Sequence, residues 1–276
     1  MRPHALAAAP AETIRSRQNA RLKDLRKHLL RPNGIHDGLI AIEGEHLLVE
    51  AVRSGLRIDT LFLREDTTGN KDWPVPSDPI TFTVAADVFN HACATESPQG
   101  IAALVEAPQW SLEPLLQNAN AVFLVLAGLQ DPGNVGTVIR TAEAFGAAGV
   151  LLTPGTVNPW NQKVLRASAG SSFRLPVVQL EKDAQLGRLR ESGISLYAAG
   201  AQAEISVFDA KLQPPMAFVI GNEGAGIPKA VFSFCSGTIQ IPYPGPVESL
   251  NAAVAAAILL YEASRQCRSS SVRTQR

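Results

Sequence analysis

The stretch from residue 239 to residue 261, IQIPYPGPVESLNAAVAAAILLY, constrains the fold more than any other part of the sequence. It predicts a short buried strand, a tight turn rich in proline and glycine, and a helix that begins at Ser249 and consists mostly of alanine. Such an arrangement is either a binding site for a small polar ligand or an ordinary strand, turn and helix with Ser249 as the N-cap. The apolar positions at helical spacing are Leu250, Val254, Ile258 and Tyr261.

Strands and helices alternate from residue 121 onwards, which predicts an α/β fold with a parallel sheet. The run from Val122 to Leu126 is continuously apolar, as expected for a strand in a sheet that is covered on both faces. The preceding residues predict a smaller α/β unit, and a length of 276 residues favours two domains. We therefore predict domains at residues 12–107 and 119–267.

Composition narrows the class of protein. A hydrophobic share of 46% with 18% charged residues indicates a globular chain with a core. No apolar run is long enough to span a bilayer, and no signal-peptide pattern is present, so we expect a cytoplasmic protein with no membrane contact. The widely separated Cys93, Cys235 and Cys267 are expected to be reduced thiols.

Histidine is confined to the first 91 residues. The second half therefore has no Ser-His-Asp triad of its own, and a His-ligated metal site there is not expected. The net charge is zero, yet Glu12 to Arg31 contains seven basic residues and only two acidic ones. The segment from Thr13 to Leu30 is thus predicted to be a basic helix, which is either a contact for a polyanion or a solvated helix face.

A second informative stretch is DPGNVGTVIRTAEAFG, from Asp131 to Gly146. It predicts a turn followed by a helix with Asn134 at its start and Arg140 off its apolar side. A fixed cation on such a helix grips a phosphate or orients a hydroxyl, unless Arg140 is a surface arginine paired with Glu143. The G-x-G-x-x-G fingerprint of nucleotide-dependent dehydrogenases is absent.

A third stretch, GNEGAGIP, runs from Gly221 to Pro228 directly after a predicted buried strand. Its three glycines allow the backbone to present N–H and C=O groups to a ligand, and Glu223 projects from the loop. Open α/β sheets bind ligands at this kind of position, beyond the carboxyl ends of strands. The alternative is a plain turn.

Together the three stretches resemble the three motifs of the SpoU/TrmH family of SPOUT RNA methyltransferases. Residues 163–170 are similar to the segment that connects the first two motifs. The N-terminal half resembles the two-domain members at Ser16, Asn19, Lys23, Glu43-Gly44 and residues 95–100. The motif positions that match are Asn134, Gly136 and Arg140, then Gly221 to Gly224 with Gly226, then Ser249, Leu250 and Asn251 after Ile241 and Pro242.

The resemblance implies a C-terminal trefoil-knotted SPOUT domain and a small N-terminal, ribosomal-protein-like RNA-binding domain. S-adenosyl-L-methionine would bind in the knot, near Gly221, Ile241 and Leu250. The enzyme would be a homodimer whose active site is completed by the partner subunit, and it would need no metal.

The implied activity is methylation of a ribose 2′-hydroxyl in RNA, with ribosomal RNA favoured over tRNA. A non-catalytic RNA-binding protein that keeps the fold is the alternative from another class. The predicted RNA contacts of the basic helix are Arg17, Arg21 and Lys23, which would position phosphates. The predicted catalytic residues are Arg140, Asn134, Glu223, Ser249 and Asn251.

Each catalytic residue has an expected role. A guanidinium is effectively always protonated, so we expect Arg140 to clamp a phosphate and stabilise the developing alkoxide rather than act as the base. Asn134 and Ser249 would hold the hydroxyl or the arginine, Asn251 would orient the loop or the ligand, and Glu223 would hold Arg140. We expect the motifs to converge on one pocket that the Arg140 guanidinium faces.

Overall fold

A computed structural model of the chain describes residues 13–31, 34–67 and 79–273. The chain forms two compact units. The first comprises the described part of Met1–Gln109 together with Asn158–Phe173, and the second comprises Trp110–Val157 and the described part of Arg174–Arg276. The compact units do not follow the predicted domain bounds of 12–107 and 119–267, since residues 158–173 pack with the first unit. The division into functional domains stays a prediction.

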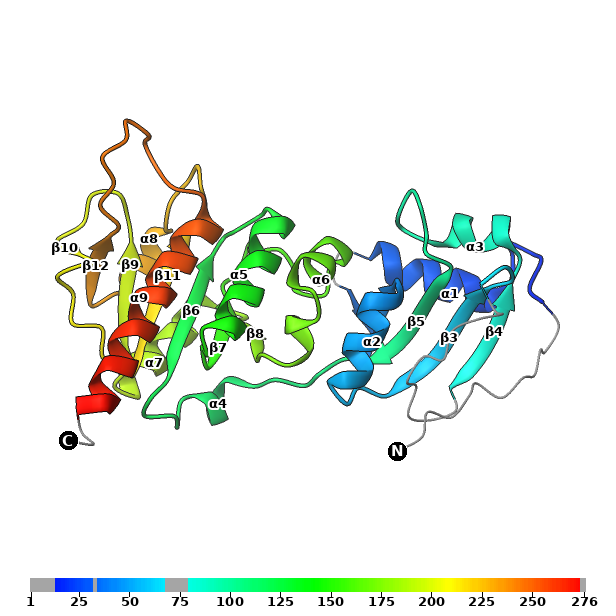
Figure 1. Cartoon of the computed structure of the whole chain (residues 1–276), viewed down its shortest axis with the longest axis horizontal. Coiled ribbons are helices and arrows are strands. Elements are labelled where there is room, and N and C mark those ends of the chain that lie inside the picture. Colours follow the sequence, from blue (N-terminus) through cyan, green and yellow to red (C-terminus); the bar gives the residue numbers. More distant parts are fainter. Residues whose placement is uncertain (1–12, 32–33, 68–78, 274–276) are drawn as a thin grey trace. The chain divides into compact units, whose positions relative to one another are not determined.

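The first unit is built on a five-stranded sheet with the order β1-β2-β5-β3-β4 (Figure 1). Neighbouring strands are antiparallel except for β3 and β4, which are parallel. Consequently β2, β3 and β4 all end at the same edge of the sheet. The strands are β1 (Ile35–His36), β2 (Leu39–Glu43), β3 (Ile58–Arg64), β4 (Ile80–Val84) and β5 (Ile101–Glu106).

Helices cover both faces of this sheet. On one face lie α1 (Ala20–Leu30) and α3 (Ala86–Ala92), whose leucines and Phe89 pack on Phe62 and Leu104. On the other face α2 (Glu45–Arg53) packs through Leu47, Leu48 and Ala51. Each face thus buries one side of the strands, and the alternation along β2 and β3 supplies apolar side chains to both.

A second helical segment, from a distant part of the sequence, packs beside α2 on the same face of the first unit's sheet. Residues 158–173 contain α6 (Gln162–Ser168) and a 3₁₀ turn at Ser171–Phe173, and they add Trp160, Leu165 and Phe173 to the core that α2 forms. Gln162 is buried and its amide donates to the backbone oxygen of Ala41 in β2 at 2.7 Å. The chain therefore begins the second unit at Trp110 and returns at residues 158–173 to complete the first unit.

The second unit is a seven-stranded, entirely parallel sheet with the order β10-β12-β9-β11-β6-β7-β8, which confirms the predicted sheet class. Strands β6 and β11, at the centre of the sheet, are apolar and almost entirely buried, as the sequence indicated for Val122 to Leu126. The strands are β6 (Val122–Ala127), β7 (Gly149–Leu152), β8 (Val177–Gln179), β9 (Ser195–Ala199), β10 (Ile205–Ser206), β11 (Met216–Gly221) and β12 (Gly237–Gln240).

Two helices, α5 (Pro132–Ala144) and α9 (Ala252–Arg273), lie on one face of this sheet and pack against each other (Figure 1). The opposite face carries α7 (Gly187–Glu191) and α8 (Lys229–Phe232), with Leu189 and Val231 in the core. The short α4 (Leu112–Leu115) precedes β6. This arrangement places the starts of α5 and α9 beside the carboxyl ends of the central strands.

The predicted basic helix from Thr13 to Leu30 is wrong at its beginning, because α1 starts only at Ala20. Asn19 caps it, with its side chain accepting from the Arg21 amide at 2.9 Å. Before the cap, Ile14 forms a parallel bridge to Val84 and extends the sheet. A capping asparagine thus decides the start, and Ile14 is buried by pairing rather than by a helix.

The apolar face predicted for the last helix is not its buried face. Val254 and Tyr261 are 49% and 57% exposed, and the buried residues lie on another side of the helix. The helix also begins at Ala252 rather than Ser249, because Asn251 caps it through bonds to the amides of the second and third residues. Small side chains let α9 approach α5 closely, so alanines form the contact. The buried residues are Ala252, Ala253, Ala256, Leu259, Leu260 and Ala263.

Candidate active site

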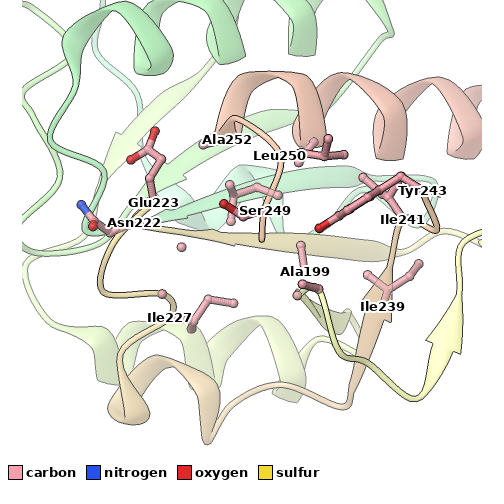
Figure 2. Close-up of a pocket in the computed structure, with 16 residues that line it drawn as sticks. Ala199, Asn222, Glu223, Ile227, Ile239, Ile241, Tyr243, Ser249, Leu250 and Ala252 are labelled. Carbon is pink, nitrogen blue, oxygen red and sulfur yellow. The ribbon is translucent and has the colours of Figure 1, made fainter. Parts of the chain in front are cut away.

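A pocket lies in the second unit, where β9, β11 and β12 end and α9 begins. Its cavity volume is about 210 Å³, and its mouth is open to solvent. Figure 2 shows Asn222 and Glu223 at one end and Ile241 and Tyr243 at the other. Small residues at the end of β9 and just after it, Ala199 to Ala201, form part of the wall.

The loop after β11 is a tight turn that its own sequence dictates. The backbones of Asn222 and Gly226 exchange two hydrogen bonds, at 3.1 and 2.9 Å, and Gly226 has a φ of +69° that favours glycine. The Asn222 side chain accepts from the amides of Gly224 and Ala225 at 2.9 and 3.0 Å. The turn is thereby fixed in shape, and Glu223 is held at its tip beside the pocket.

Gly221 is required by the same turn. A Cβ at this residue would lie 2.5 Å from the backbone carbon of Gly226 and 2.6 Å from the amide nitrogen of Ile227. Those are backbone atoms that cannot swing aside. The loop therefore folds back over Gly221, which lines the pocket through its backbone.

Hydrogen bonds join the three motifs. Asn134, near the start of α5, donates from its side-chain amide to the Glu223 carboxylate. Asn251 donates from its amide to the Asn134 side-chain oxygen at 3.0 Å. At the other end of this series, the Asn251 oxygen accepts from the backbone amides of Ala253 and Val254 at 2.9 and 3.3 Å. We call Asn134, Glu223 and Asn251 the amide network.

The segment between β12 and α9 closes the pocket on the remaining side. Ile241, Tyr243, Ser249 and Leu250 all line it. The Tyr243 hydroxyl donates to the backbone oxygen of Glu248 at 3.2 Å and so ties the two ends of the proline-rich turn together. Ser249 is exposed at the pocket wall, where its hydroxyl is accessible to a ligand.

Matches to known families agree with this geometry. The model of the SpoU rRNA methylase family matches residues 121–261, and that of the MRM3-like substrate binding domain matches residues 19–103. The chain belongs to the SpoU methylase family. The predicted family, α/β SPOUT fold, enzyme class and S-adenosyl-L-methionine cofactor are confirmed.

Individual SpoU relatives cover both units. The chain is 35% identical over 252 residues to the Bacillus subtilis 23S rRNA (guanosine(2553)-2′-O)-methyltransferase RlmP, a match that spans 90% of this chain and 97% of that protein. Among solved structures, the SpoU methyltransferase AviRb from Streptomyces viridochromogenes, in complex with AdoMet, superposes with a TM-score of 0.83. That match is 28% identical and covers 91% of this chain and 99% of the other. An AdoMet-bound rRNA methyltransferase from Sinorhizobium meliloti superposes with a TM-score of 0.77 at 26% identity, covering 92% and 97% of the two chains.

Most of the residues predicted from the SpoU motifs gather at the pocket. Asn134 and Asn251 are linked to Glu223 through the amide network. Arg140 differs, because it neither lines the pocket nor belongs to the amide network. The predicted residues that do line it are Gly221, Glu223, Ile241, Ser249 and Leu250.

Arg140 is exposed and has no hydrogen-bond or ion-pair partner among the residues that the structure describes. The expected bond from Arg140 to Glu223 is not found in the described chain, where Glu223 accepts from Asn134. The alternative pairing with Glu143 is also wrong, because Glu143 makes a two-point ion pair with Arg174 at 2.6 and 3.1 Å. Arg140 thus presents an uncommitted cation on α5, about 9 Å along the helix from Asn134.

The three predicted RNA contacts lie in the first unit. Arg17 precedes α1 and pairs weakly with Asp87 at 3.5 Å, while Arg21 and Lys23 are exposed on α1 itself. Arg21 and Lys23 point to different sides of the helix, because two residues turn it by about 200°. They do not form a single stripe.

Sequence reasoning missed several pocket residues. Ala199 ends β9 and is followed by Gly200 and Ala201, while Asn222 and Tyr243 lie within the predicted motifs but had no assigned role. A signal for the first three was available, since they are small residues directly after a predicted strand of a parallel sheet.

In the part of the chain that the structure describes, no three His, Cys, Asp or Glu side chains are grouped to hold a metal ion. Nor does any described helix combine the length and apolar character needed to cross a membrane.

Proposed function

We propose that this protein methylates a ribose 2′-hydroxyl in ribosomal RNA with S-adenosyl-L-methionine as the methyl donor. The observation that carries the proposal is the amide network, which joins Asn134, Glu223 and Asn251 beside the pocket. RlmP, which the chain matches over nearly its whole length, is named as a 23S rRNA 2′-O-methyltransferase, and this supports ribosomal RNA over tRNA.

The pocket suits the proposed cofactor. Its wall consists of small residues and of Ile239, Ile241 and Leu250, which provide an apolar surface for a flat base. Gly221 exposes backbone rather than a side chain, so polar groups of a nucleoside can bond to main-chain atoms. When bound, S-adenosyl-L-methionine supplies an electrophilic methyl group on a cationic sulfonium.

The chain's own residues would position the hydroxyl. Ser249 and Glu223 both line the pocket and are exposed to it, so either can accept or relay the proton that the 2′-hydroxyl loses. Asn134 fixes the Glu223 carboxylate by donating to it. Arg140, as an uncommitted cation, would clamp the adjacent phosphate and stabilise the developing alkoxide.

Arg140 provides a sharp test of this mechanism. Because its side chain is exposed and has no partner in the described chain, Arg140→Ala should change the stability of the fold by no more than about 0.5 kcal/mol. We expect the variant to lose methyl transfer while its affinity for the cofactor stays nearly unchanged. Arg140→Lys should also be inactive if the guanidinium grips phosphate through two bonds. A loss of cofactor binding in Arg140→Ala would contradict the clamp role.

The substrate itself is tested by incubating the protein with methyl-tritiated cofactor and total RNA, followed by mapping of the labelled nucleotide. Label in ribosomal RNA at a 2′-hydroxyl is the expected result. Label in tRNA would favour the alternative substrate. No label, together with RNA binding and no cofactor binding in a titration, would favour a non-catalytic RNA-binding protein.

We also propose that the active form is a cytoplasmic homodimer and that the second unit is knotted. The exposed Val254 and Tyr261 on α9 leave an apolar strip that a second copy would cover. The knot is supported by the path after β12, because that strand pairs with β9 and β10 before the chain returns to place α9 against α5.

For the first unit we propose RNA binding through Arg17, Arg21 and Lys23. These side chains are exposed, and contacts from such cations to phosphates release counterions. Replacing all three by glutamine should reduce the slope of log affinity against log salt by about two to three. An unchanged slope would remove these residues from the interface.

A further inference from the structure

Glu43, the last residue of β2, has a buried carboxylate whose residue is only 6% exposed. Burying such a charge is costly unless its oxygens are hydrogen-bonded. One oxygen accepts from the backbone amide of Ala94 at 3.0 Å, and the other accepts from the Thr95 hydroxyl. Both donors belong to the loop formed by residues 94–100, so the Glu43 carboxylate anchors the start of that loop.

The same loop is fastened at further points. The Gln99 side-chain oxygen accepts from the Glu45 amide at 3.1 Å, at the start of α2. Arg64 donates from its guanidinium to the backbone oxygen of Pro98 at 3.3 Å and from its amide to that of Gly100 at 2.9 Å. A segment without regular secondary structure is therefore held at several points by the strands and by α2. Binding residues are often found on loops that a rigid scaffold positions in this way.

Residues 94–100 lie where β2, β3 and β4 end, at one edge of the first unit's sheet. Two arginines reach the same edge. Ile14 pairs with Val84 at the end of β4, and the following Arg15 and Arg17 form exposed ion pairs with Glu65 and Asp87 at 3.4 and 3.5 Å. Such exposed pairs contribute little free energy, so these cations can exchange a carboxylate for a phosphate.

We propose that Glu43 is a positioning residue for the RNA substrate. It holds residues 94–100 in the shape that contacts the bases or riboses, while Arg15 and Arg17 at the same edge contact phosphates. The exposed side chains at the tip, Glu96 and Ser97, are the contacting groups. The proposal rests on the proposed RNA methyltransferase function and adds a second, non-helical contact surface to it.

The experiment compares Glu43→Ala with Glu43→Gln in the full-length chain, with ribosomal RNA transcribed in vitro as the substrate. A glutamine at this position accepts from the Ala94 amide and donates to the Thr95 oxygen, so it retains the hold on the loop. We expect Glu43→Ala to raise KM for the RNA by about tenfold or more, with kcat at saturating RNA and the Kd for the cofactor unchanged. Glu43→Gln should stay within about threefold of the original protein.

An unchanged KM in a folded Glu43→Ala variant would overturn the proposal, as would a loss in kcat alone. If Glu43→Ala does not fold, Ser97→Trp at the loop tip decides the question. Its matched control is Ile80→Trp, which places the same bulk on a residue that is 57% exposed at the opposite end of β4. We expect only Ser97→Trp to weaken RNA binding, and equal binding by both variants would overturn the proposal.

The readout that separates the two proposals is retention of the same transcript on a filter. It measures RNA binding without methyl transfer. An original protein that binds the transcript but transfers no methyl group counts against the proposed function, and the Ser97 comparison still decides the role of the loop.

Discussion

Asn134→Asp replaces one NH₂ group of the amide network by an oxygen and changes little else. The carboxylate oxygen that accepts from Asn251 remains, so that bond can persist. The other oxygen would then face the Glu223 carboxylate, to which Asn134 now donates. A donor–acceptor contact becomes a contact between two negative charges.

The cost of this change follows from the contact it removes. A hydrogen bond to a charged group contributes about 1.5–3 kcal/mol, and two like charges about 4 Å apart repel by about 1 kcal/mol in a solvated site. The solvated value applies, since Glu223 is exposed. The lost hydrogen bond and the repulsion together cost about 3 kcal/mol, which lowers the population of the state with the three motifs bonded together by roughly a hundredfold. We expect kcat to fall by that factor.

The assay is transfer of tritiated methyl groups to ribosomal RNA, measured from about pH 5 to pH 8.5. Two carboxyls in contact share a proton more readily than an isolated one, so part of the activity of Asn134→Asp should return as the pH falls. The matched control is the double variant Asn134→Asp with Glu223→Gln, in which residue 223 donates to residue 134. Recovery of at least about tenfold is expected. If Glu223→Gln alone is active and the double variant is no better than Asn134→Asp, the network does not position the site.

Three other predictions follow from the described geometry. Gly221→Ala should cost about 1–3 kcal/mol of stability and weaken cofactor binding in a calorimetric titration, because its Cβ would meet backbone atoms 2.5 Å away. Val254→Arg should convert a dimer to a monomer in sedimentation, with unchanged circular dichroism, and a dimeric variant would place the interface elsewhere. Burial raises the pKa of the Cys235 thiol to about 11, so iodoacetamide at pH 8 should label it slowly and faster only as the pH rises, which mass spectrometry measures.

The parallel sheet was predictable from sequence because its strands are marked by composition alone. Val122–Ala127 and Met216–Gly221 are apolar on both faces, and this pattern arises only when helices cover both sides. The start of α1 was not predictable from the same periodicity. Arginine and lysine are tolerated before and within a helix, and only the Asn19 side chain, bonded to the Arg21 amide, fixes where it begins.

The membership of residues 158–173 in the first unit also could not be predicted. Locally the segment is a helix of the expected kind, with Asn161 as its N-cap. Its partners are Ala41 and the core formed with α2, more than a hundred residues earlier in the chain. Periodicity indicates which residues of a helix are buried but carries no information about the element that covers them.

The structure joins three of the predicted site residues, Asn134, Glu223 and Asn251, by bonds that the sequence did not predict. The polarity of this amide network explains why the residue types matter. Backbone amides can only donate, so the start of α9 forces the Asn251 side chain to present its oxygen to them and its NH₂ group to Asn134. Asn134 must then accept from that group and donate to Glu223. The start of α9 therefore determines which atom donates in each hydrogen bond of the series, from Asn251 through Asn134 to the Glu223 carboxylate. An aspartate at either asparagine position would keep the shape and lose the donor, so we predict that the site needs amides at both positions.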